Sequence, residues 1–137
     1  MPRSRATRLS TALVALSVLG SLALWPRLPA EMAIHFSASG TPDNFVPRVV
    51  GAFLLPAVMV LTLLVVRWAM RSDPPADPRL GRLVTVATVG FLSALHGLVL
   101  GWNLGYPVPF DLVLVVALVL GVALCGYVIR RESVSPG

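Results

Sequence analysis

Residues 49–66 read VVGAFLLPAVMVLTLLVV and carry no charged side chain, although Arg48 and Arg67 stand directly at the two ends. About 20 helical residues cross the hydrocarbon core of a bilayer. Three further uncharged runs of similar length cover residues 9–25, 83–102 and 112–129. Because backbone polar groups in lipid must be paired within their own segment, we expect each run to form an α-helix. The sequence therefore predicts an all-α, polytopic membrane protein with four transmembrane helices.

The composition supports lipid as the solvent of this chain. Hydrophobic residues make up 56% and charged residues 12% of the 137 residues, against about 25% charged residues in typical soluble domains. The net charge of +5 comes from arginines that separate the apolar runs, a pattern typical of membrane topology. We therefore expect the lipid bilayer as a partner and no nucleic acid. The single Cys125 excludes an internal disulfide.

The arginines also predict an orientation. If the N-terminus is cytoplasmic, only Arg27 and Arg48 fall on the outer side, and nine arginines fall on the inner side. Those nine are Arg3, Arg5, Arg8, Arg67, Arg71, Arg79, Arg82, Arg130 and Arg131. This bias follows the positive-inside rule. We expect a multi-pass protein of the cell (inner) membrane with both termini cytoplasmic. A cleaved signal peptide at the first run is disfavoured, because the run is long and no A-x-A site follows it.

The polar residues gather between the first two runs, in LPAEMAIHFSASGTPDNFVPR at residues 28–48. Ile34 and Phe36 flank His35 in strand-like alternation. Gly40 and its serine neighbours are typical of a turn, and Phe45 supplies an apolar anchor. Loops of this length are commonly functional. We expect an ordered extracytoplasmic loop over residues 26–48.

This stretch resembles a family. Its pattern is similar to the small bacterial membrane domain of unknown function found at the N-terminus of SdpI-type immunity proteins, and the resemblance covers about residues 10–70. The matching positions are Leu28, Pro29, Ile34, His35, Phe36, Gly40, Pro42, Asp43, Phe45 and Arg48, followed by Pro56 in the next span. Two positions depart from the pattern: Ala33 stands where the family usually has Pro, and Arg48 stands where it usually has Lys.

The resemblance implies a non-enzymatic role, immunity-like or sensory, in which the outer loop recognises an external peptide, toxin or membrane protein partner. The alternative is an accessory or structural subunit of a membrane transporter complex. We find no nucleophile–His–Asp arrangement, phosphate loop or HExxH motif in the sequence. We therefore expect no enzyme activity and no cofactor.

The loop residues allow three interpretations. His35, Glu31 and Asp43 have metal-ligating groups, but their spacing fits no known site, so we expect no metal. In a structural role, Asp43 caps backbone N–H groups, His35 bonds across the loop and Arg48 anchors at the headgroups. In a recognition role, the loop presents Pro29, Glu31, His35, Phe36, Gly40, Pro42, Asp43, Phe45 and Arg48 to a partner. A rigid loop serves both of the last two roles.

The spans carry three further signals. His96 is ionisable within the third run, and a bond across helices is favoured over a proton relay. Pro56 should kink the second helix and free the carbonyl near Ala52. Small residues share a face at Gly90, Ala94, Gly97 and Gly101, and again at Ala117 and Gly121. These faces favour close packing inside the bundle over dimerisation.

The chain divides into two expected parts. Residues 1–70 form the membrane domain of the SdpI N-terminal type, with helices at about 9–25 and 49–68 and the outer loop at 26–48. Residues 71–137 form a cytoplasmic linker (71–79), a transmembrane helical hairpin at about 83–102 and 112–129, and a short polar tail.

Overall fold

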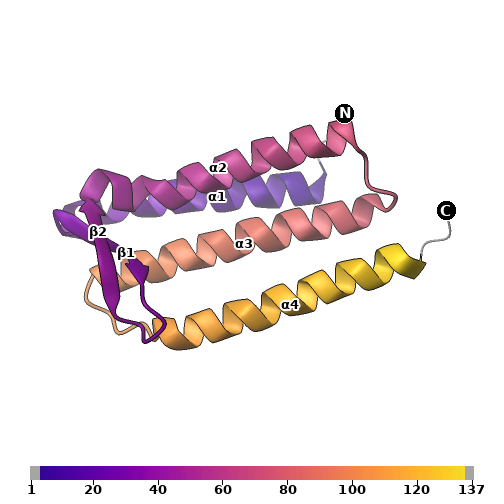
Figure 1. Cartoon of the computed structure of the whole chain (residues 1–137). Coiled ribbons are helices and arrows are strands. Elements are labelled where there is room, and N and C mark those ends of the chain that lie inside the picture. Colours follow the sequence, from indigo (N-terminus) through magenta and orange to yellow (C-terminus); the bar gives the residue numbers. More distant parts are fainter. Residues whose placement is uncertain (1–3, 135–137) are drawn as a thin grey trace.

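The computed structural model describes residues 4–134, and four long helices account for most of them (Figure 1). They are α1 (Arg5–Leu24), α2 (Arg48–Ser72), α3 (Pro78–Asn103) and α4 (Phe110–Val134). Each is long and apolar enough to cross a membrane, with mean hydropathies of 1.7, 2.8, 2.0 and 2.9 in their most apolar stretches. The four predicted apolar runs thus lie in four helices.

The connection between α1 and α2 contains a small sheet, and in this respect the all-α prediction is wrong. After one 3-10 turn, η1 (Trp25–Arg27), the chain forms strands β1 (Glu31–Phe36) and β2 (Pro42–Pro47). The two strands pair antiparallel. The alternation around His35 lies inside β1. An isolated two-stranded hairpin is marginally stable in water, so this one depends on its packing against the helices.

All four helices extend beyond the predicted apolar runs, and α1 already begins at Arg5. α2 continues to Ser72, α3 begins at Pro78 and α4 continues to Val134. The expected linker at 71–79 therefore shortens to residues 73–77, and the expected polar tail is helical up to residue 134. The side chain of Asp77 caps α3 by accepting a hydrogen bond from the Arg79 backbone N–H at 2.8 Å, and Pro78 suits the first helical position.

The two-stranded sheet lies at one end of the molecule, and the described arginines predicted to lie on the inner side are at the other end (Figure 1). Strands β1 and β2 lie across the hairpin end, where α1 and α3 finish and α2 and α4 begin. The arginine end is the opposite end, and it carries Arg5, Arg8, Arg67, Arg71, Arg79, Arg82, Arg130 and Arg131. Arg3, which the predicted orientation also counts, lies outside the described residues.

Helices α1, α2 and α3 pack together, whereas α4 contributes little to the core. Among the described residues of α4, Phe110 at its start is the one that is buried. None of the most apolar stretch of α4 is buried. A Cβ atom at Gly90, Gly97, Gly101 or Gly121 would meet nothing within 4 Å in the described chain. The expected close packing at these glycines inside the bundle is therefore wrong.

A polar network joins the three packed helices in the half nearer the hairpin. The Ser17 and Ser93 hydroxyls lie 3.1 Å apart, between α1 and α3. One turn further along α1, Ser21 Oγ donates to the Ala52 carbonyl of α2 at 2.6 Å. Ala52 is the residue whose carbonyl loses its helical donor, because Pro56 has no N–H. The hydroxyl of α1 thus replaces the hydrogen bond that Pro56 removes.

The same hydroxyl indicates which ring nitrogen of His96 acts as a donor. His96 Nε2 lies 2.8 Å from Ser21 Oγ, and the ring is 1% exposed. The one hydroxyl proton of Ser21 goes to the Ala52 carbonyl, so the oxygen accepts from Nε2, which must carry a proton. His96 is therefore bonded across helices, as the sequence favoured.

We predict that Ser21→Ala lowers the free energy of unfolding by about 1–3 kcal/mol, because it leaves the Ala52 carbonyl without its donor and removes the Ser21 contact of the His96 ring. Pro56→Ala returns an N–H to that carbonyl, so Ser21→Ala should cost about 1 kcal/mol less in this background. Unfolding of the four variants by SDS in mixed micelles measures the coupling. Strictly additive effects would contradict the pairing.

Candidate functional site

The hairpin at residues 31–47 contains most of the candidate site residues. Met32 pairs with Val46 and Ala33 with Phe45, and after an irregular step His35 pairs with Asn44. The turn closes through hydrogen bonds from Ser37 N to the Thr41 carbonyl and from Gly40 N to the Ser37 carbonyl, both at 2.8 Å. Gly40 has a φ of 81°, a left-handed conformation that favours glycine. The predicted turn thus needs its glycine.

Met32 anchors the base of the hairpin in the helices. It is fully buried in a cluster with Leu28, Ala52 and Leu100. The cluster is tight: a Cβ atom at Gly51 would lie 2.6 Å from the Met32 Cβ atom. A glycine at the start of α2 therefore lets β1 approach the helix closely.

Arg48 and Pro29 also belong to this base. The Arg48 Nε donates to the Pro29 carbonyl at 3.1 Å, and its guanidinium lies 5.4 Å from the centre of the Trp25 ring. The Arg48 backbone N–H donates to the Ala30 carbonyl at 2.8 Å. Pro29 and Arg48, which both match the family pattern, therefore hold the connection between η1 and α2 in place.

Asn103, at the last turn of α3, completes the edge of β1. Its Oδ1 accepts from the Ala33 N–H at 2.8 Å, and its Nδ2 donates to the Ala33 carbonyl at 2.9 Å and to the Val99 carbonyl at 2.8 Å. The side chain thereby imitates a neighbouring strand. The sequence reasoning missed this residue, although a lone carboxamide at the end of an apolar run was the available signal.

The turn of the hairpin rests on the start of α4. The ring of Phe36 stacks on Phe110 with centroids 3.7 Å apart, and it meets Trp102 edge-on at 5.3 Å. A Cβ atom at Gly40 would lie 3.3 Å from the Asp111 backbone nitrogen. Phe36 and Gly40 therefore connect the hairpin to the fourth helix.

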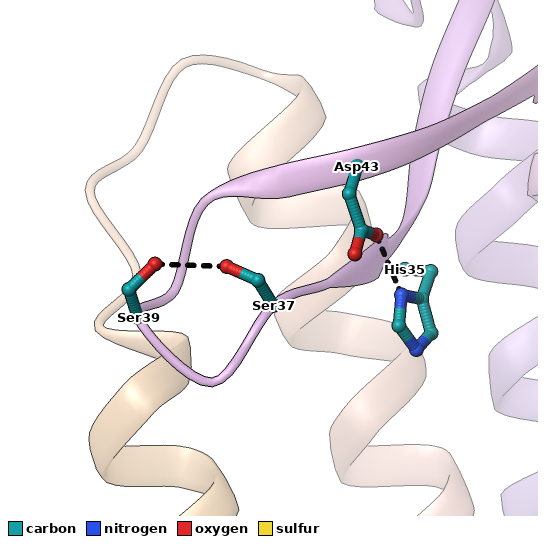
Figure 2. Close-up of polar contacts among 4 residues, drawn as sticks. All are labelled: His35, Ser37, Ser39 and Asp43. Atoms are coloured by element: carbon teal, nitrogen blue, oxygen red, sulfur yellow. Dashed lines mark hydrogen bonds and ion pairs between the residues drawn. The ribbon is translucent and has the colours of Figure 1, made fainter.

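The exposed side of the hairpin carries an imidazole–carboxylate pair. His35 Nδ1 lies 2.5 Å from Asp43 Oδ1, and the side chains are 68% and 47% exposed. Figure 2 shows the two residues pointing toward one another from adjacent strands, with the other ring nitrogen directed away. Exposed ion pairs contribute only about 0.2–1 kcal/mol, so stability gives little reason for this pair. His35 does bond across the loop, and its partner is Asp43, which was expected to cap backbone N–H groups.

The remaining predicted residues lie around this pair without joining it. Glu31 is exposed at the start of β1, Pro42 begins β2, and Phe45 is 51% exposed. Among residues 4–134, no group of three His, Cys, Asp or Glu side chains is placed to hold a metal ion. Ser37 and Ser39 bond to one another at 2.8 Å in the turn (Figure 2).

An apolar cleft lies beneath the hairpin, with a volume of about 260 Å³. Residues 34–37 line it from the hairpin, and side chains of α2, α3 and α4 form its other walls. His35 and Ser37 are its polar lining residues, and the others are apolar or glycine. The cleft therefore combines an apolar interior with a polar edge beside the His35–Asp43 pair, as ligand sites commonly do.

The comparisons with known proteins agree with a membrane domain. Residues 12–60 match the family described as "Domain of unknown function (DUF1648)". The chain is similar to the uncharacterized membrane protein YbgB of Bacillus subtilis (strain 168), with 35% identity over 53 residues. That match covers 39% of this chain and 54% of the Bacillus protein, about half its length. No solved structure is significantly similar. With its four apolar helices, the chain is a multi-pass membrane protein carrying a membrane domain of unknown function.

We predict that Asn103→Ala loosens the hairpin, because both backbone groups of Ala33 lose their partner. The free energy of unfolding should fall by about 1–3 kcal/mol. Hydrogen exchange at the Ala33 N–H should accelerate. Mass spectrometry of exchanged protein in detergent measures this, with Asn44→Ala as a control on the exposed strand. Unchanged exchange at Ala33 in the Asn103 variant would contradict the assigned role.

Proposed function

We propose that this protein is a non-enzymatic recognition protein of the cell membrane, immunity-like or sensory. In this proposal the hairpin end is extracytoplasmic and meets an external peptide, toxin or partner protein, and both termini are cytoplasmic. The resemblance to the SdpI-type N-terminal domain motivates the immunity-like role, and the hairpin supplies the contact surface.

The distribution of arginines supports this orientation. Eight arginines lie at the arginine end of the described chain, and Arg27 and Arg48 lie at the hairpin end. The positive-inside rule assigns the arginine-rich end to the cytoplasm. Trp25 and Trp102 also lie at the hairpin end, and tryptophan side chains favour the membrane interface.

One observation carries the recognition role: the hairpin is fixed at its base but exposes chemistry that its own stability does not need. Met32, Asn103 and Phe36 fix it to α2, α3 and α4 respectively. Asp43 holds Nδ1 of His35, so Nε2 is left to bond a ligand. A surface that is ordered before binding loses less conformational entropy on association.

The cleft indicates the kind of ligand. An external peptide with an apolar side chain would place that side chain between α3 and α4, and its polar backbone would meet His35 and Ser37. Binding of such a peptide would use both the apolar cleft and the polar side chains of His35 and Ser37 at its edge.

The orientation gives a direct prediction. In a Cys125→Ser background, Ser39→Cys should react with a membrane-impermeant thiol reagent in intact cells. Ser72→Cys, at the arginine end, should react only after permeabilisation. Both positions are exposed in the structure, so burial does not limit the reaction. The reverse labelling pattern would place the hairpin on the cytoplasmic side and exclude an external ligand.

The recognition role predicts a loss of protection. Cells that express the chain should survive a panel of membrane-active peptides better than cells without it. His35→Ala and Asp43→Ala should abolish the survival advantage. The control Asn44→Ala, next to Asp43 in β2, should keep it. Survival counts at equal membrane levels of each variant measure the effect. Equal survival of all variants and of cells without the chain would argue against this role.

A second function, an accessory subunit of a membrane transporter complex, is favoured by the state of α4. None of its most apolar stretch is buried, and a Cβ atom at Gly97 or Gly101 of α3, or at Gly121 of α4, would meet nothing within 4 Å in the described chain. Small residues let a partner helix approach closely in lipid. Purification in mild detergent separates the two functions, because a stoichiometric partner supports the subunit and a lone chain supports the recognition protein.

A further inference from the structure

A second pocket lies at the arginine end, far from the hairpin. Its volume is about 290 Å³, and it is formed by the first turns of α1, the last part of α2 and the start of α3. Its walls are of two kinds. Apolar side chains such as Val14, Val60 and Leu63 line one part, and Arg67, Arg82 and a group of hydroxyl side chains line the other.

The two arginines of this pocket are not neutralised by the protein. Within residues 4–134, neither guanidinium forms an ion pair with a carboxylate. The carboxylate of Asp77 accepts instead from the Arg79 backbone N–H. The pocket therefore combines two positive charges with no anion. Guanidinium groups bind phosphate oxygens through paired hydrogen bonds, and this makes a phosphate the fitting partner.

Ser10 supplies an independent observation. Its side chain lines the pocket and is 1% exposed, yet its hydroxyl has no hydrogen-bond partner among the described residues. The neighbouring hydroxyls are satisfied by their own helices: Thr11 donates to the Thr7 carbonyl at 2.8 Å and Thr85 to the Gly81 carbonyl at 2.7 Å. Buried polar groups are almost always paired, so the Ser10 hydroxyl indicates an acceptor that lies outside the described residues 4–134.

The depth of the pocket selects the source of that acceptor. Arg67 directly follows the apolar run of α2, and Val60 and Val14 lie within the spans. A soluble phosphate would contact the arginines but leave the apolar wall unused. A phospholipid would use both parts, because its phosphate lies at the boundary where its acyl chain enters the hydrocarbon region.

We propose that this pocket binds an anionic phospholipid, with the phosphate between Arg67 and Arg82 and one acyl chain along Val14, Val60 and Leu63. The Ser10 hydroxyl donates to the headgroup or ester oxygens. Basic pockets between transmembrane helices are suited to anionic headgroups. This site is independent of the recognition function at the hairpin, so either one can fail without the other.

Native mass spectrometry of the full chain tests the proposal with phosphatidylglycerol and phosphatidylcholine of matched acyl chains. The double variant Arg67→Gln/Arg82→Gln should lose phosphatidylglycerol affinity by about tenfold or more. The matched control Arg8→Gln/Arg71→Gln removes the same charge at the same end but lies outside the pocket, and it should stay within about twofold. Equal losses in both variants would show a general charge effect and overturn the site.

Two further measurements keep the test decisive. Ser10→Ala removes only an unpaired hydroxyl, so the fold is kept, and a loss of about threefold or more in phosphatidylglycerol affinity is expected. Unchanged affinity in that variant would overturn the role of Ser10 in the site. Excess inorganic phosphate should not displace the lipid, because the acyl chain contributes to binding. Displacement by inorganic phosphate, or equal affinity for phosphatidylcholine, would overturn the assignment to an anionic phospholipid.

Discussion

A carbonyl without a donor inside a membrane is the constraint around which three of the helices are arranged. Pro56 removes the hydrogen bond that the Ala52 carbonyl would receive in a regular helix, and lipid offers no substitute. The Ser21 hydroxyl supplies it from α1, and the same oxygen receives the His96 ring from α3. One small group therefore connects α1, α2 and α3 at a defined depth and rotation.

The same physical rule governs the hairpin. A strand edge exposes N–H and C=O groups that need partners, and the described edge of β1 finds them in the carboxamide of Asn103. Met32 and Phe36 add apolar contacts at the two ends of the strand. Because these contacts are made on the helix side, the opposite side can carry His35 and Asp43 without a packing role.

The two ends of the molecule therefore differ in chemistry. The hairpin end presents a fixed polar surface above an apolar cleft. At the arginine end, Arg67 and Arg82 line a pocket with Ser10, whose hydroxyl has no partner among residues 4–134. α4 borders the cleft and is attached mainly through Phe110 and the turn at Gly40. Its exposed length is compatible with lipid or with a partner helix.

The sequence by itself determined the features that depend only on the order of residues along the chain. Hydropathy measured against bilayer thickness predicted four helical spans, and the missing N–H of Pro56 predicted a free carbonyl at Ala52. The strand-like alternation of Ile34 and Phe36 around His35 indicated a strand at β1. Two apolar residues were too few to predict that this strand pairs with β2. The division of the chain at residue 70 stays a prediction. Only the tertiary structure decided that Asn103 completes β1, that Asp43 pairs with His35, and that Ser10 is buried without a partner. It also left open space within 4 Å of a Cβ atom at Gly97 and at Gly101 in the described chain. These contacts depend on how each helix is rotated and shifted along its neighbours, and hydrophobic periodicity does not encode that rotation, because lipid accepts every apolar face of a helix equally.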